Sequence, residues 1–151
     1  MPSTYKYAFG LQRNSRAFIE SAVEYTSQGY RENWKFAILH LNTALELILK
    51  ATLAMDDHRH LVAGKEQVTD RQFDEGAFRS IGIEECLERL AKGGLLTLDA
   101  TQRQTIDALQ RLRNRIAHYI EPDDAPAMKA IVAAGVNLFI EVHDAAFTRR
   151  R

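Results

Sequence analysis

The sequence predicts an all-α protein, an up-and-down bundle of about five helices that forms one domain over residues 1–151. Apolar residues recur at helical spacing in five segments, and no segment alternates between apolar and polar residues as a half-buried strand does. Size is the third observation, because a chain of 151 residues, 46% of them hydrophobic, can bury a substantial core within a single domain.

Two long helices are expected first. One lies within residues 1–29 and ends at Gly29, since glycine readily adopts the backbone that terminates a helix. The alternating residues of a possible extended lead-in to it are Tyr5, Tyr7 and Phe9. Residues 31–57 form the clearest helix, with an apolar stripe so wide that more than one of its faces should be covered, either inside the bundle or by a second subunit. Glu46 and Lys50 are four residues apart in it and should pair.

The middle of the chain is less regular. Residues 58–81 lose the helical period and read as a long irregular excursion, which could cover a site or dock a partner. A short helix over 82–92 follows and ends at two glycines. Asp99 is a good N-cap for the next helix, which should run to about Ile120.

The last helix should be capped by Asp123 or Asp124 and carry Pro126 in its first turn. Gly135 lies inside this helix, where glycine costs about 1 kcal/mol relative to alanine. That cost suggests a purpose, namely a close approach by a neighbouring helix.

Composition bounds the environment of the protein. Twenty basic and twenty acidic residues cancel, so any RNA site must come from a local cluster of basic side chains. The single cysteine, Cys86, excludes an internal disulfide and is expected in the core. No charged-then-apolar leader follows Met1, and no uninterrupted apolar run reaches the ~18 residues of a membrane span. We therefore expect a cytoplasmic protein that does not enter a membrane.

The most informative stretch is residues 109–119, which places an arginine, an asparagine and a histidine at the end of an otherwise core-packing helix. Asn114 and His118 are four residues apart, so they share a face and could hydrogen-bond. Arg113 and His118 diverge by about 140° around the helix. The two could therefore flank a groove that a second helix closes.

His118 should lie in the last turn, because Pro122 disfavours a helix beyond about Ile120. The negative end of a helix favours a charged imidazole, and histidine titrates near neutral pH. A proton donor or acceptor is therefore plausible at this position. The plainer alternative is that Arg113 and His118 only cap and solvate the end of the helix.

The segment from Arg113 to His118 resembles the Arg-polar-x-x-x-His motif of the HEPN superfamily (higher eukaryotes and prokaryotes nucleotide-binding). Residues 34–51 look like the long second helix of that family, and residues 83–98 look like the short helix and loop before its motif helix. The likeness covers roughly residues 5–147. It implies a homodimer in which two motifs face each other across a cleft.

The resemblance implies a metal-independent endoribonuclease without a cofactor, and it suggests a role in a toxin–antitoxin or anti-phage system. Arg113 and His118 of both subunits would be catalytic, and Asn114 would orient His118 or bind a phosphate. Arg111 and Arg115 could follow the RNA backbone, or could simply form a solvated basic face. The alternative function is a HEPN-like module that binds nucleotide, RNA or a partner protein without cutting.

Tyr119 bears on the partner. In HEPN toxins paired with a nucleotidyltransferase, the tyrosine two residues after the motif histidine is adenylylated, but here that position is Ile120. This departure puts neutralisation by nucleotide transfer in doubt and leaves core packing as the default for Tyr119. An antitoxin or a nucleotidyltransferase remains a possible partner.

Other histidines give weaker signals. Asp56 and His60 are four residues apart and could share a metal on a helix, but no third ligand is evident, so we expect a polar helix end without metal. His40 and His143 have no partner set in the sequence and are expected to be polar or half-buried helix residues.

Overall fold

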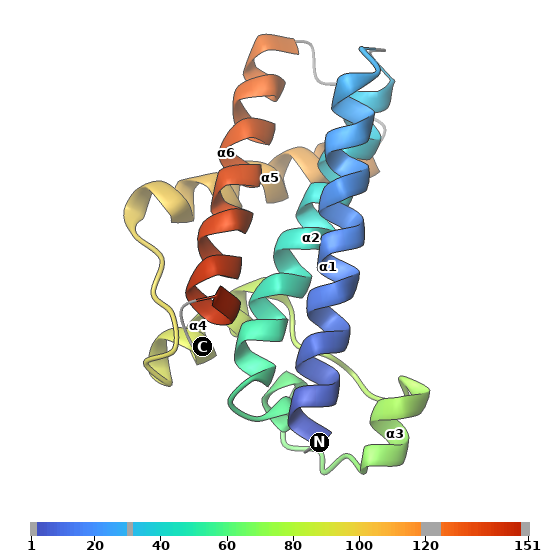
Figure 1. Ribbon diagram of the computed structural model, residues 1–151, viewed down its shortest axis with the longest axis vertical. Helices are drawn as coiled ribbons and strands as arrows, with labels where there is room; N and C mark the ends of the chain where they lie inside the picture. Colours follow the sequence, from blue (N-terminus) through green and yellow to red (C-terminus); the bar gives the residue numbers. More distant parts are fainter. Residues whose placement is uncertain (1–2, 30–31, 119–124, 149–151) are drawn as a thin grey trace.

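The computed structural model describes residues 3–29, 32–118 and 125–148, and within these ranges the chain forms α-helices and no β-strand (Figure 1). The α-helices are α1 (Ser3–Ser27), α2 (Asn33–Ala54), α3 (Asp70–Glu75), α4 (Ile83–Lys92), α5 (Ala100–Ala117) and α6 (Ala125–His143). Two short turns complete the list, a 3-10 turn η1 (His58–Leu61) and a π-helical turn η2 (Asp144–Thr148). The prediction of an all-α helical bundle is confirmed.

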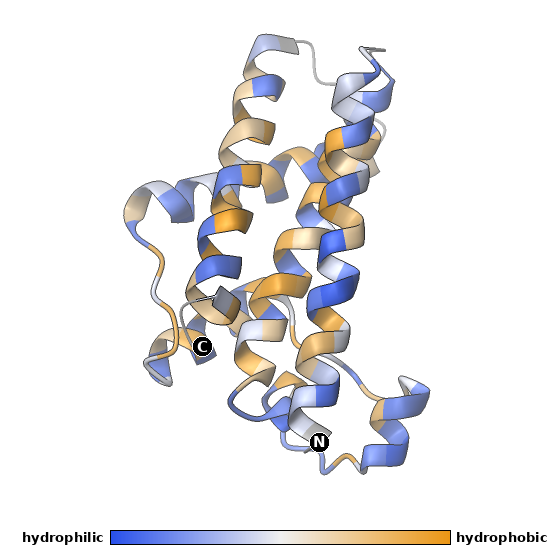
Figure 2. Cartoon of the chain, in the orientation of Figure 1, coloured by the Kyte–Doolittle hydropathy of each residue, from blue (hydrophilic) through white to orange (hydrophobic). Residues whose placement is uncertain are grey.

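Helix α2 is the centre of the bundle. It contacts α1, α4, α5, α6 and η1, and 13 of its 22 residues are buried. Hydropathy follows the same plan, since the side of each long helix that faces its neighbours is the more apolar one (Figure 2). Helices of the same chain therefore cover most of the wide apolar stripe that the sequence predicted for α2.

The long helices do not all run up and down. Helices α1, α2 and α6 follow the long axis of the molecule, with α1 opposite in direction to the other two, whereas α5 lies across them (Figure 1). Gly135 of α6 marks the place where these layers meet. A Cβ atom there would lie 2.7 Å from Leu41 Cδ2 of α2 and 2.9 Å from Leu109 Cδ1 of α5. Glycine therefore permits the close approach that the sequence suggested.

The excursion over residues 58–81 is ordered by α1. Thr4 Oγ1 lies 3.1 Å from Nδ1 of the buried His58, and Lys6 Nζ donates to Asp74 Oδ1 at 2.6 Å. These contacts fasten the excursion to the end of the bundle where α1 begins and α2 ends.

An extended lead-in over Tyr5, Tyr7 and Phe9 is a wrong prediction, because α1 is already helical from Ser3. The Tyr7 ring packs against His58 and Phe73, with centroids 4.8 and 5.2 Å away. Contacts with the excursion thus support a helix in a segment whose local pattern favoured a strand.

Several local predictions are confirmed. Gly29 follows α1 with φ +71°, and Lys50 Nζ donates to Glu46 Oε1 at 2.7 Å. The Asp99 carboxylate caps α5 by accepting from the backbone N–H of Gln102, and the Gln102 side-chain oxygen accepts from the backbone N–H of Asp99. Pro126 lies in the first turn of α6. Helix α5 ends at Ala117, about one turn before the expected end near Ile120. The cap at Asp123 or Asp124 falls outside the described residues.

Within the described residues, two helices are long and apolar enough to cross a membrane, judged by length and composition alone. In α2 (Asn33–Ala54), 61% of the apolar window is buried within this fold, as in the core helix of a soluble protein. In the stretch Pro126–Thr148 the buried share is 33%. Packing within the chain thus buries most of the apolar surface of α2, whereas much of the surface of α6 stays uncovered.

Candidate functional site

The last two turns of α5 carry the side chains that the sequence singled out. The helix is anchored further back, where Ile106, Leu109 and Leu112 are buried against the bundle. Between Leu112 and His118, where the described part of this segment ends, the half-buried Ile116 is the residue that packs against the core. The exposed residues of this helix end are Arg111, Arg113, Asn114, Arg115, Ala117 and His118. We call this set the α5 tip.

His118 is the C-cap of α5, with φ −95° and ψ 19°. Its backbone N–H donates to the carbonyl oxygens of Asn114 and Arg115 at 3.1 and 3.2 Å, so the backbone of the cap is held. Its imidazole is exposed. It also lies at the negative end of the helix, as the sequence predicted.

Asn114 contacts Arg113 rather than His118. Its Oδ1 accepts a hydrogen bond from Arg113 Nη1 at 3.3 Å, and no side-chain bond to His118 occurs in the described part of the chain. Asn114 is thus placed to orient the guanidinium, a role that sequence spacing did not suggest.

The arginines of the α5 tip differ from most others in the molecule. Four arginines, Arg59, Arg71, Arg89 and Arg103, each pair with a carboxylate. Arg111, Arg113 and Arg115 have no carboxylate within ion-pair distance among the residues that the structure places. Three guanidinium groups within five residues, with no acidic partner in the described ranges, make the described tip locally basic in a chain without net charge.

One chain supplies one histidine to this region. Arg113 and His118 lie on different sides of α5, as expected, and pockets lined by described residues lie away from both. Tyr119 lies outside the described residues. A second catalytic histidine would therefore have to come from another molecule.

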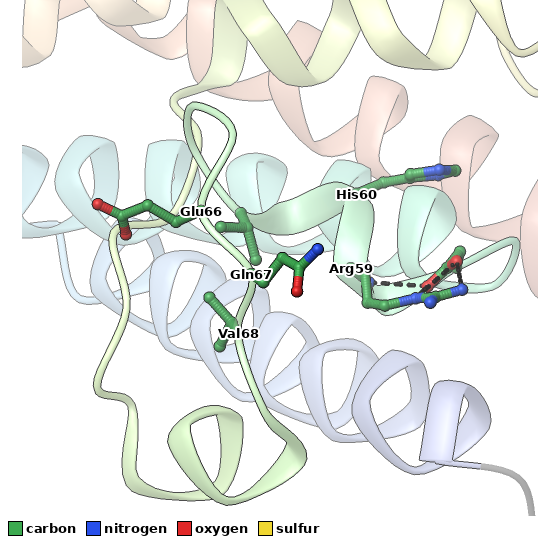
Figure 3. A pocket seen from close by; sticks show the side chains of 7 residues that line it. Arg59, His60, Glu66, Gln67 and Val68 are labelled. Carbon is green, nitrogen blue, oxygen red and sulfur yellow. Dashed lines mark hydrogen bonds and ion pairs between the residues drawn. The ribbon is translucent and has the colours of Figure 1, made fainter.

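A second polar cluster surrounds a pocket of about 500 Å³ in the excursion (Figure 3). Asp57 and Arg59 line it as a closed pair, with Arg59 Nη2 2.6 Å from Asp57 Oδ2 and Nε 3.0 Å from both carboxylate oxygens. These hydrogen bonds from Arg59 lower the pKa of Asp57 to about 2. Because Asp57 and Arg59 already pair with each other, neither of these charges is left to bind an ion, and Glu66 is the remaining carboxylate of the pocket lining.

His60 Nδ1 lies 3.4 Å from Asp56 Oδ2 at the rim of the same region, so the two residues do approach each other as the sequence suggested. Across residues 3–29, 32–118 and 125–148, no three histidine, cysteine or acidic side chains gather as metal ligands would. The pair thus forms the polar end that follows α2.

Cys86 is a buried core residue, as predicted. Burial raises the pKa of its thiol to about 12. The thiolate is the nucleophilic form of cysteine, so Cys86 is unsuited to catalysis at neutral pH.

Sequence reasoning missed partners for two histidines. His40 Nδ1 lies 2.8 Å from Ser21 Oγ, and His143 Nε2 lies 3.0 Å from Gln12 Nε2. The residues of the second pair are 131 positions apart in the chain. No local pattern in the sequence could have indicated this pairing.

Comparison with known proteins identifies a family without adding an activity. Neither the curated proteins nor the solved structures include a significant match to the chain. The pattern that defines one protein family matches residues 11–150, from within α1 to beyond η2. The chain therefore belongs to the family described as a domain of unknown function, DUF3644.

Proposed function

We propose that the protein is a metal-independent endoribonuclease of HEPN type, acting in the cytoplasm as a homodimer with a composite active site. The observation that carries the proposal is the α5 tip, where one helix end carries an exposed histidine and three arginines that have no carboxylate partner among the residues the structure describes. A toxin or anti-phage role, with an antitoxin or nucleotidyltransferase as partner, is part of the same proposal.

The chemistry follows from these side chains. One His118 takes the proton of a ribose 2′-hydroxyl, whose oxygen attacks the adjacent phosphorus. The bond from phosphorus to the 5′-oxygen breaks, and the second His118, from the paired subunit, protonates the leaving oxygen. The products are a 2′,3′-cyclic phosphate and a 5′-hydroxyl. The reaction consumes no water and requires no metal ion.

Arg113 stabilises the extra negative charge that develops on the phosphate oxygens during this step. A guanidinium suits this task because its planar fork can donate two parallel hydrogen bonds. Asn114 supports it through the 3.3 Å bond between Oδ1 and Nη1. Arg111 and Arg115 attract the RNA backbone on either side of the cut.

A non-catalytic module that binds nucleotide, RNA or a partner protein at the same tip is the alternative. The placement of Arg113 and His118 on different sides of α5 favours this alternative. Two side chains on different sides of one helix can each bind a ligand without both reaching the same phosphate. A single RNA cleavage assay distinguishes the two functions.

The test is RNA cleavage by the purified chain in the presence of EDTA. We expect wild-type protein to cut single-stranded RNA, with His118→Ala and Arg113→Ala each slowing the reaction at least about 100-fold. Asn114→Ala should slow it about tenfold, because the guanidinium remains but loses a positioning contact.

Arg79→Ala is the matched control, since Arg79 is an exposed arginine outside the α5 tip, and it should cut at the wild-type rate. Circular dichroism of each variant shows that the fold is intact. Equal cleavage by all variants contradicts the proposal. RNA binding without cleavage, weakened by Arg113→Ala, establishes the alternative instead.

A further inference from the structure

A groove remote from the α5 tip in sequence is lined by residues of α1, of the end of α6 and of η2. The first half of α1 and the end of α6 both lie in the half of the bundle that contains the N-terminus (Figure 1). It has a volume of about 480 Å³ and opens to solvent. The residues that line it are Phe9, Gln12, Arg13, Arg16, His143, Phe147 and Thr148. On α1 these residues recur at intervals of three and four, so a single face of that helix forms one wall.

The bottom of the groove is held rigidly. His143 is stacked between the rings of Phe139 and Phe147, with centroid distances of 6.2 and 5.7 Å. Its Nε2 lies 3.0 Å from Gln12 Nε2, and its Nδ1 lies 3.5 Å from Asp144 Oδ1. Because an amide nitrogen can only donate, Gln12 donates to Nε2, and this hydrogen bond holds the Gln12 side chain against the imidazole.

The contact with His143 leaves two polar atoms of the Gln12 side chain available to a ligand. Its Oε1 and its second amide hydrogen have no partner among the residues that the structure describes. An acceptor and a donor side by side match the polar edge of a nucleobase.

The wall formed by α1 supplies positive charge. Arg13 is exposed and has no carboxylate partner in the described ranges. Arg16 lies one turn further along, and Glu20 lies 3.7 Å from it as its acidic partner among the described residues, with both side chains largely exposed. Such an exposed pair is weak, so a phosphate can replace Glu20 as the partner of Arg16.

Aromatic surface comes from both sides of the groove, from Phe9 on α1 and from Phe147 on η2. Phe9 and Phe147 are half-buried, with ring centroids 6.0 Å apart and planes inclined at 56°. Phe147 is presented by η2, and π-helical turns within helices are frequent at functional sites. Aromatic side chains beside arginines are the combination that binds single-stranded nucleic acid and nucleotides, because each base has a face for stacking.

We propose that this groove binds a nucleoside phosphate, either free or as the phosphorylated end of a single strand. Arg13 and Arg16 bind the phosphate, Phe147 packs against the base, and Gln12 hydrogen-bonds to its edge. The proposal does not depend on Arg113 or His118, so it stands or fails separately from RNA cleavage.

The experiment is an NMR titration of the isotope-labelled full chain with adenosine 5′-monophosphate (AMP), with inorganic phosphate and adenosine as separate arms. We expect saturable shifts of backbone signals in residues 9–16 and 143–148. Arg13→Ala should raise the Kd for AMP at least fivefold, whereas Arg79→Ala, an exposed arginine outside the groove, should leave it unchanged. Phe147→Leu should weaken AMP binding and leave phosphate binding unchanged, because it removes only the stacking surface.

Shifts confined to other residues, a Kd unaffected by Arg13→Ala, or phosphate binding as tight as AMP binding would each overturn the proposal. A final arm uses a 5′-phosphorylated tetradeoxyadenylate, which has no 2′-hydroxyl and cannot be cut by transfer to that group. Tighter binding than AMP identifies a strand end as the ligand, and equal binding identifies the free nucleotide.

Discussion

The arginines of this chain differ chiefly in whether they form an ion pair with a carboxylate. Arg59 is bound by Asp57 in the excursion, whereas Arg13 and Arg113 have no acidic partner among the residues described. An arginine that already has a partner holds the fold together, and one without a partner can bind a phosphate at little cost. This distinction rests on spatial neighbours, so residue type alone could not reveal it.

Asp57 provides a test at this scale. Its folded-state pKa of about 2 lies below the unfolded value of about 3.9. Such a carboxylate stabilises the fold above the unfolded pKa, and this contribution is lost as the pH falls toward the folded pKa. Asp57→Asn should therefore lower the free energy of unfolding at pH 6 by up to about 1 kcal/mol, with the difference vanishing near pH 2.

Urea unfolding at pH 6, 4 and 2.5 measures that difference. Glu66→Gln, which changes another carboxylate that lines the same pocket, should leave the stability unchanged. A difference between Asp57→Asn and wild type that stays constant over this range would show that Arg59 does not hold the carboxylate in its charged form.

Among the helices, sequence reasoning worked wherever structure is decided locally. The helical period located α1, α2, α4, α5 and α6, and the cap at Asp99 set the start of α5. It failed at α3, a helix of six residues that is too short for a periodic signal, and at the start of α1, which contacts the excursion. The direction of α5 across the bundle depends on packing around Gly135, which no single segment encodes.

Two glycines test the helix packing as a pair. Gly135→Ala should lower the free energy of unfolding by about 1 kcal/mol, because overpacking against Leu41 and Leu109 outweighs the better helix propensity of alanine. Gly10→Ala should raise it by up to about 1 kcal/mol, since nothing lies within 4 Å of the added Cβ. Thermal unfolding of both variants is the measurement. Stabilisation by Gly135→Ala would mean that α6 does not approach α2 and α5 this closely.

At the scale of the whole molecule, the two candidate sites differ in how far apart their residues lie in the sequence. The residues of the α5 tip adjoin one another in the chain, so the sequence could indicate them from a motif of six residues, Arg113 to His118. The groove between α1 and α6 joins residues 131 positions apart, and only the fold brings them together. The uncovered surface of α6 and the single histidine of the tip both leave room for a second subunit, which the proposed mechanism requires.

The most direct test of that requirement is cleavage by mixed dimers of wild-type and His118→Ala chains, co-expressed at several ratios and quantified by mass spectrometry. If each active site needs His118 from both subunits, RNA cleavage in EDTA should fall as the square of the wild-type fraction. A linear fall would show that each chain cuts alone, and it would contradict the composite site.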